Sequence, residues 1–199
     1  MRTGGGKEKD KSWRNRGSAG TPPRRRLARR ANVRPVAAPK DACPCGSARS
    51  YAACCEPFHR GVREAPDAET LMRSRFSAFA KRELEYLWHT LHPDHEDRRA
   101  DRGALVAALR TAANAHRYVA LAICDREEPD GAGIARVLFA ARVFENKLPR
   151  GADRSFVELS EFTHDGEGWR YLAGETRPWS AFRGDVATLT IAAFRAGAG

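Results

Sequence analysis

The chain has 199 residues, of which 42% are hydrophobic and 30% are charged, so it can bury a core while most elements stay amphipathic. It contains no run of about 18 apolar residues, which argues against a membrane-spanning helix. No apolar stretch follows the basic start of the chain, so we expect no secretory signal peptide and a cytoplasmic location.

Residues 1–40 carry the excess positive charge of the chain. They contain thirteen Lys and Arg but only two acids, whereas the remaining residues hold 22 bases and 23 acids. With Trp13 as its only aromatic residue, this segment cannot offset an ordering entropy of about 1–2 kcal/mol per residue, so we expect a disordered basic tail. Two interpretations stay open: a solvated extension without a role, or an electrostatic arm for RNA, the ribosome or another polyanion.

Four of the five cysteines lie within thirteen residues, namely Cys43, Cys45, Cys54 and Cys55. A Cys-x-Cys pair, a gap of eight and a Cys-Cys pair let the chain reverse, so that two sulfurs reach one tetrahedral ion from each side at about 2.3 Å. Four thiolates favour zinc over magnesium or calcium, and such a closed site holds structure. His59 is the alternative fourth ligand. An iron–sulfur cluster and four unrelated thiols are the other interpretations.

Amphipathic segments after the cysteines predict helices. Asp67 is a suitable N-cap, and Leu71 and Phe76 belong to the apolar face of the first helix. Two further helices are expected over residues 84–91 and 101–116.

After these helices, apolar and polar residues begin to alternate along the sequence, which predicts strands. They cover residues 119–123, 134–144, 156–162 and 169–172. Asp-Gly pairs at residues 130–131 and 165–166 supply hairpin turns. A final helix is expected from Ala181 to Phe194. Helices followed by an antiparallel meander indicate an α+β domain in which one curved sheet wraps around helices.

The cysteine segment, which opens Cys43-Pro-Cys45-Gly46-Ser47, resembles the SEC-C zinc motif at the C-terminus of the SecA translocation ATPase. The four cysteines fall on the ligand positions of that motif, where SecA usually has His in the fourth place and many stand-alone copies have Cys. Ala48 and Arg49 stand where Gly-Lys is usual, so a tight turn that depends on glycine is not expected at Ala48.

The order of the cysteine segment and the block Leu71-Met-Arg-Ser-Arg-Phe76 resembles the YchJ-like family of uncharacterised proteins. The resemblance implies a zinc knuckle followed by a cone-shaped nuclear transport factor 2-like domain. It also makes a homodimer through the open sheet face an expectation. The resulting domain organisation is a tail over residues 1–40, a knuckle over 41–61, a cone over 64–176 and a C-terminal extension over 177–199.

A cone of this kind can hold a pocket between sheet and helices, so inward polar residues are candidates for chemistry. Arg73 and Arg75 flank the apolar face of the first predicted helix. For Arg73, a structural ion pair under the knuckle is the main interpretation, and a position in the interior is the alternative. His89, His92 and His95 share a spacing of three, which allows either a second metal site or unrelated loop histidines.

Two acids of the third predicted strand are further candidates. Glu158 and Glu161 fall on opposite faces of that strand, so one of them faces any pocket. An acid–base pair with His116 or His164 is an alternative to simple structural roles. No nucleophile motif, phosphate loop or cofactor fingerprint occurs, so an enzyme is not expected.

The leading hypothesis is therefore a cytoplasmic zinc-binding interaction module that contacts a protein, a chaperone or the ribosome. The first alternative is a small-molecule-binding or enzymatic cone braced by structural zinc, which a deep polar pocket holding Glu158 or a histidine favours. A filled apolar interior excludes that alternative. The second alternative is a nucleic-acid tether through residues 1–40.

Overall fold

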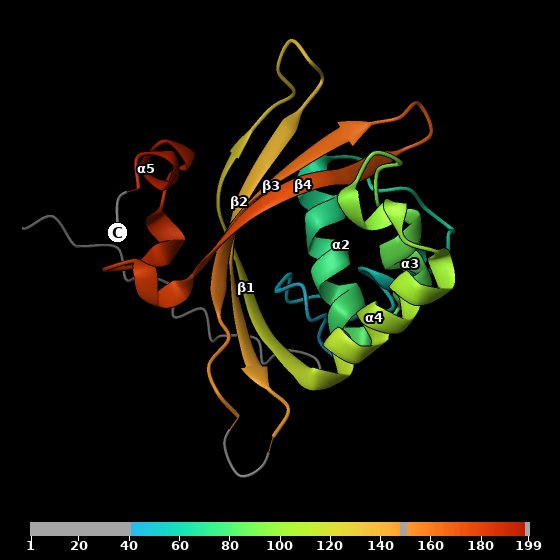
Figure 1. The fold of residues 1–199 in the computed structure, drawn as a ribbon, viewed down its shortest axis with the longest axis horizontal. Coiled ribbons are helices and arrows are strands. Elements are labelled where there is room, and N and C mark those ends of the chain that lie inside the picture. The colour runs from blue at the N-terminus through green and yellow to red at the C-terminus, as the bar shows by residue number, and fades with distance from the viewer. Residues whose placement is uncertain (1–40, 148–150, 198–199) are drawn as a thin grey trace, which may run out of the picture. The chain divides into compact units, whose positions relative to one another are not determined.

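The computed structural model describes residues 41–147 and 151–197, so the predicted basic tail lies outside the described residues (Figure 1). Its helices are α1 (Glu56–His59), α2 (Ala68–Lys81), α3 (Leu84–His89), α4 (Arg102–Ala115) and α5 (Ile191–Arg195). Its strands are β1 (His116–Glu127), β2 (Ala135–Glu145), β3 (Phe156–His164) and β4 (Trp169–Pro178). Three 3₁₀ helices add η1 (Glu96–Arg99), η2 (Trp179–Ala181) and η3 (Val186–Thr188).

The helix starts follow from side-chain caps that the sequence announces. The Asp67 carboxylate accepts the Thr70 amide at 2.6 Å and fixes the start of α2. Asp101 caps α4 in the same way, accepting the Ala104 amide at 3.0 Å. The three helices predicted between the cysteine segment and the strands are confirmed, although α3 ends at His89, two residues before the predicted limit.

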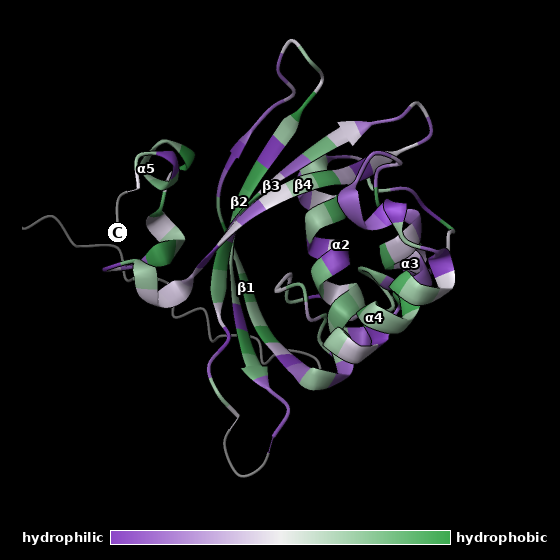
Figure 2. Ribbon diagram, viewed as in Figure 1, coloured by the Kyte–Doolittle hydropathy of each residue, from purple (hydrophilic) through white to green (hydrophobic). Residues whose placement is uncertain are grey.

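The four strands form one antiparallel sheet in the order β1-β2-β3-β4, as the meander prediction requires. Alternation along β2 divides its apolar residues between two faces, and Figure 2 shows alternating hydropathy along the strands. Val137, Phe139 and Ala141 pack in the cluster that contains residues of α2. Leu138 and Ala140 belong to a second cluster with residues of the C-terminal segment. Both faces of the sheet are therefore buried.

The inner face of the sheet is covered by α2, α3 and α4, and the outer face by the segment that ends in α5 (Figure 1). This arrangement corrects the prediction of one helix over residues 181–194. Gly184 adopts a left-handed φ of +81°, and the Asp185 and Thr190 side chains each cap a new short helix. These local interactions break the segment into η2, η3 and α5.

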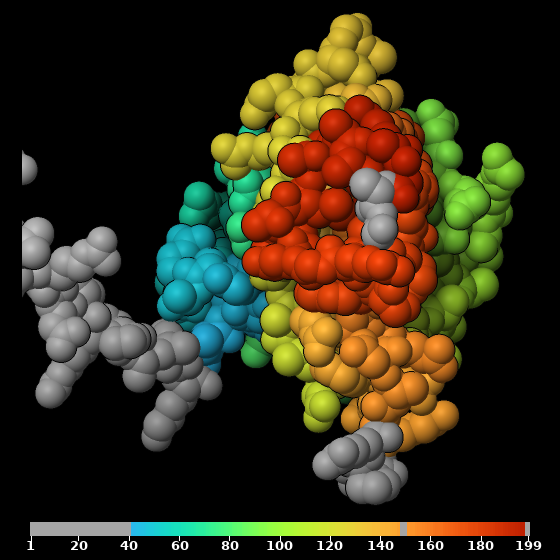
Figure 3. Space-filling view, turned by 90° about the vertical axis from the view of Figure 1, so that its left-hand side faces the viewer, coloured from blue at the N-terminus to red at the C-terminus, as the bar shows by residue number. Residues whose placement is uncertain are grey.

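The outer-face segment also bears on the expected homodimer. Val186, Ile191 and Phe194 are each at most 4% exposed and pack on Leu138 and Val157 of the sheet. Figure 3 views this side and shows the C-terminal segment, in red, across the face. A dimer through this face would have to displace the chain's own segment. Homodimerisation remains a prediction.

Among the described residues, no helix has both the length and the apolar character that crossing a bilayer requires.

Candidate metal centre and cone cavity

A tight hairpin brings the four clustered cysteines together. The Cys43 amide donates to the Arg49 carbonyl at 2.8 Å, and Ala42 pairs with Ser50 in an antiparallel bridge. Gly46 takes the left-handed φ of +78° that this reversal needs. As a result the sulfurs of Cys43, Cys45, Cys54 and Cys55 all lie within 4.8 Å of one another, and all four residues are buried.

The sulfur spacing fits a tetrahedral metal ion. Four ligands at about 2.3 Å from one ion lie about 3.8 Å from each other. The Cys45 and Cys54 sulfurs are 3.5 Å apart, and those of Cys54 and Cys55 are 3.8 Å apart. Hydrogen bonds from Cys45 and Cys55 lower the pKa of the Cys43 thiol, and the bond to Cys43 raises the pKa of the Cys55 thiol. A bound cation would allow every sulfur to ionise.

Several polar groups around the sulfurs suit a site with excess negative charge. The Cys54 sulfur lies 3.1 Å from the Ser47 hydroxyl, and the Arg49 guanidinium donates to it at 3.3 Å. The Ser77 hydroxyl lies 3.5 Å from the Cys43 sulfur. Donors of this kind stabilise metal-bound thiolates. Arg49 was not predicted as a contact, although it replaces a usual lysine at this position.

Arg73 and His59 join the cysteine segment to α2. Arg73 pairs with Glu69 at 2.8 Å and donates to the Cys45 carbonyl at 3.1 Å, which confirms the predicted ion pair under the knuckle. His59 donates through Nε2 to the Ser74 carbonyl at 2.9 Å, and its Nδ1 lies 2.8 Å from the Tyr51 hydroxyl. Both ring nitrogens therefore have partners away from the sulfurs.

Ala48 adopts the turn that the sequence argued against, with a left-handed φ of 59°. This conformation costs a non-glycine residue about 1–2 kcal/mol, and a glycine would avoid that cost. The gain is only partial, because glycine has a larger conformational entropy in the unfolded state and therefore loses more on folding. We expect Ala48→Gly to stabilise the protein by about 0.5–1 kcal/mol, measured as a higher urea midpoint. Ala53→Gly, at an exposed position of the same segment outside the left-handed region, is the control and should destabilise.

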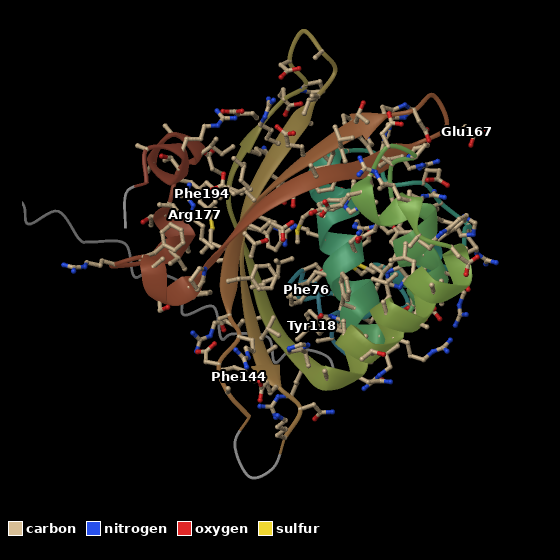
Figure 4. All side chains as sticks on the ribbon, viewed as in Figure 1. Phe76, Tyr118, Phe144, Glu167, Arg177 and Phe194 are labelled. Carbon is tan, nitrogen blue, oxygen red and sulfur yellow. The ribbon has the colours of Figure 1, made fainter. Side chains whose placement is uncertain are left out.

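A cavity of about 320 Å³ lies between the inner face of the sheet and the helices. Aromatic side chains are prominent in its otherwise mixed wall, among them Phe76, Phe79, Tyr118, Phe139, Phe156 and Phe162. Figure 4 shows Phe76 and Tyr118 on the helix side of the sheet, and their rings meet edge to face at 5.7 Å between centroids. The cone interior is therefore hollow, and its size is at the lower end of ligand pockets.

One end of the cavity is polar and contains Glu158. Its Oε1 accepts from the Ser160 hydroxyl at 2.6 Å and the Tyr171 hydroxyl at 3.1 Å, while its Oε2 accepts from Thr176 at 3.0 Å. A bulge in β4 makes this possible, because Tyr171 pairs with Phe162 and Gly174 pairs with Ser160, which puts both on the inner face.

The other predicted acid and the two histidines lie elsewhere. Glu161 faces the opposite side of β3 and pairs with Arg136 at 2.8 Å. His116 contacts the Ala112 carbonyl through Nδ1, and His164 accepts the Gly166 amide. The predicted division of Glu158 and Glu161 between two faces is confirmed. Within residues 41–147 and 151–197, neither histidine is hydrogen-bonded to either acid.

Arg75 and His95 complete the polar end. Arg75 donates through Nη1 to the Leu87 carbonyl at 2.9 Å and to the Thr90 hydroxyl at 2.6 Å, and it stacks 4.8 Å from the centre of the Tyr171 ring. Burial lowers the pKa of its guanidinium. His95 Nδ1 accepts the Asp97 amide at 3.1 Å, and burial lowers the pKa of its imidazole.

The histidine triplet does not form a second metal site in the described part of the chain, where the four cysteines are the only such group. His92 accepts the Asp94 amide, and His89 packs on Trp88. Only His95 lines the cavity. Sequence spacing could not separate it from the others because its position depends on the contact between residues 90–92 and Tyr171 of β4.

Gly174 leaves the space that Glu158 and Tyr171 occupy. A methyl group there would lie 2.6 Å from Glu158 Oε1 and would also meet the Tyr171 hydroxyl. We expect Gly174→Ala to separate these two groups and to destabilise the protein by about 1–3 kcal/mol in urea unfolding. Gly131→Ala, in a hairpin turn with no atom within 4 Å of the new methyl group, should change stability little.

Comparisons with known proteins agree with this arrangement. The family model described as "YchJ, middle NTF2-like domain" matches residues 67–174, and the SEC-C motif matches residues 40–57. A UPF0225 protein from Deinococcus radiodurans is 40% identical over 130 residues, which are 65% of this chain and 85% of that relative.

Two solved structures share the fold. The solution structure of a SEC-C motif containing protein from Rhodopseudomonas palustris has a TM-score of 0.56 and 28% identity, covering 67% of this chain and 96% of that one. The crystal structure of a SEC-C motif containing protein from Psychrobacter arcticus has a TM-score of 0.52 and 21% identity, covering 73% and 89%, which is a likeness of fold. The chain thus belongs to the YchJ-like UPF0225 family, with a SEC-C motif ahead of a nuclear transport factor 2-like domain.

Proposed function

We propose that this protein binds a small organic molecule in its cone cavity and that the cysteine knuckle is a structural zinc site bracing the cone. The cavity carries the proposal, because an aromatic space of about 320 Å³ with a polar end that contains Arg75, His95 and Glu158 is the usual composition of a ligand site. A filled interior would have been the more stable arrangement of such a core.

Zinc is the ion that best suits the knuckle. Four buried sulfurs at tetrahedral spacing leave no open coordination position, and zinc prefers this soft, closed environment. The knuckle contacts α2 through His59 and Arg73, so the metal would brace the middle of the helix that also supplies Arg75 to the cavity. This chain's own residues would thus orient the cavity wall, while the metal would supply only rigidity.

A protein-interaction role has less support on the described surface. Across residues 41–147 and 151–197, Val62 and Val119 are the only large hydrophobic residues that are strongly exposed, at 74% and 53%. Docking surfaces usually present a contiguous apolar patch. Contact with a protein, a chaperone or the ribosome remains a prediction, as does nucleic-acid binding through residues 1–40.

The proposal is tested with phenylacetamide, a neutral aromatic probe, by ligand-observed NMR on the zinc-loaded protein. We expect saturable binding that Leu109→Trp weakens, because this substitution enlarges a partly exposed side chain of the cavity wall. Leu189→Trp makes the same change in the segment over the outer face and should leave binding unchanged. Absence of saturable binding, or equal loss in both variants, would contradict a role for the cavity.

A further inference from the structure

We propose that the ligand of the cone cavity carries a carboxylate and that Arg75 binds this group; the inference rests on the proposed function. Arg75 lies on α2, is 9% exposed, and lines the cavity. The proposal follows from three features of the polar end: the unused donors of Arg75, the acceptors already engaged at Glu158, and the charge balance around them.

The first feature is the free edge of the Arg75 guanidinium. A guanidinium has five N–H donors, and Arg75 spends both Nη1 hydrogens on the Leu87 carbonyl and the Thr90 hydroxyl. Among the described residues, its Nε and Nη2 atoms have no hydrogen-bond partner. Two parallel N–H groups on one edge are the geometry that a carboxylate accepts as a bidentate pair.

Access to this edge matters as well, because Arg75 is one of the residues that line the cavity. In the described part of the chain, Arg98 Nε is the only fully enclosed side-chain nitrogen or oxygen without a partner. The unpartnered nitrogens of Arg75 are therefore not sealed inside the protein. The ring of Tyr171 and the two Nη1 bonds hold the guanidinium in place, so the edge is ordered before a ligand arrives.

The second feature is that acceptors at this end are already engaged. Glu158 receives three hydroxyl groups, from Ser160, Tyr171 and Thr176. His95 Nδ1 accepts an amide, which leaves Nε2–H of the neutral ring as a donor. Apart from the exposed carboxylates of Glu96 and Asp97, the hydrogen-bonding capacity that remains at the polar end is mainly donor capacity, so the buried part of a ligand must bring acceptors.

The third feature is charge. In residues 41–147 and 151–197, no carboxylate forms an ion pair with Arg75, although Glu158 and Asp97 lie close enough to favour its charged form. A buried guanidinium without a direct counter-ion is costly, and a carboxylate at its free edge would remove that cost. Glu96 and Asp97 also line the cavity and are exposed, so they stay solvated and would disfavour a second negative charge.

The remaining wall defines the rest of the ligand. The aromatic side chains named above suit a flat apolar body, and about 320 Å³ has room for about ten waters at 30 Å³ each. The ligand class is therefore a small aromatic monocarboxylate.

Three probes of one shape and different charge test the inference: phenylacetate, phenylacetamide and phenethylamine, titrated into the zinc-loaded full chain. We expect phenylacetate to bind at least about 10-fold more tightly than phenylacetamide, because hydrogen bonds to charged groups contribute more than neutral ones. Phenethylamine should bind most weakly.

Variants then assign the effect to Arg75. Arg75→Gln should weaken phenylacetate about 10-fold to 100-fold and leave phenylacetamide within a few-fold. Arg75→Lys keeps the charge but loses the bidentate edge, so it should restore only part of the affinity. Arg110→Gln removes an exposed arginine of α4 outside the cavity wall and should change nothing.

The outcomes separate this inference from the proposed function. Equal binding of phenylacetate and phenylacetamide, or tightest binding of phenethylamine, would overturn the carboxylate while leaving a ligand-binding cavity. No binding of any probe would count against both. Should Arg75→Gln fail to fold, as its contacts with residues 87 and 90 make conceivable, the comparison of probes on the wild type decides alone.

Discussion

Removal of the metal should unfold the knuckle and destabilise the whole described domain. Structural zinc contributes about 10–16 kcal/mol of apparent binding free energy in small zinc modules, and this energy is available only to the folded state. Cys54→Ser removes one buried sulfur of the proposed zinc site, which also contacts Ser47 and Arg49. We expect this variant to lose its zinc and at least about 4 kcal/mol of stability, which lowers the unfolding temperature by roughly 10 °C.

Cys124→Ser is the matched control for this prediction. Cys124 is partly buried against the outer-face cluster, where burial raises the pKa of its thiol to about 11, and it lies outside the sulfur group. Metal content by mass spectrometry and thermal unfolding should resemble those of the wild type. A Cys54→Ser protein that keeps one zinc and its unfolding temperature would contradict the assignment.

The alternative ligand His59 is tested by the same measurement. His59→Gln should keep one zinc per chain, because both imidazole nitrogens are engaged with Tyr51 and Ser74 rather than with sulfur. Stability should still fall by about 1–3 kcal/mol, since a partly buried link between α1 and α2 is lost. Loss of the metal in this variant, with retention in Cys55→Ser, would exchange the roles of the two residues.

Phe194→Ala should produce the second large effect. The Phe194 ring is 0% exposed, stacks on Phe182 and lies 4.2 Å below the Arg177 guanidinium, which also donates to the Phe194 carbonyl at 2.7 Å (Figure 4). Truncation of such a ring costs about 3–5 kcal/mol. The truncation should also loosen the C-terminal segment that ends in α5 from the outer face of the sheet, and so expose Leu138 and Val157.

Urea unfolding and light scattering measure both consequences. The free energy of unfolding should fall, and self-association should rise with concentration as the outer face opens. Phe144→Ala is the control, because this ring is only partly buried near one end of β2 and should cost clearly less. Equal losses in the two variants, or no change in association, would show that the C-terminal segment does not protect the sheet.

The sequence predicts the elements well wherever one local period dominates. The α2 cap at Asp67, the alternation of β3 and the two Asp-Gly turns depend on nearby residues, and all were predicted. The C-terminal helix was predicted wrongly because apolar spacing there reflects packing on the sheet, while Gly184 and Thr190 interrupt the backbone. β4 extends to Pro178 because β3 pairs with it along this length.

The candidate site divides in the same way. The clustering of the four cysteines follows from spacing within one hairpin, and the division of Glu158 and Glu161 between two faces follows from strand parity. The roles of Arg75 and His95 depend on contacts between α2, the residues around Thr90 and β4, which are distant in sequence. The bulge that aligns Tyr171 and Gly174 has no signal in the sequence that periodicity could detect.

The most direct test of a ligand-binding cone is an amide NMR titration of the zinc-loaded protein with phenylacetate. The account predicts saturable shifts concentrated at the residues that line the cavity, among them Phe76, Tyr118 and Glu158, with little change over α5. Shifts absent at saturating probe, or confined to the outer face of the sheet, would contradict it.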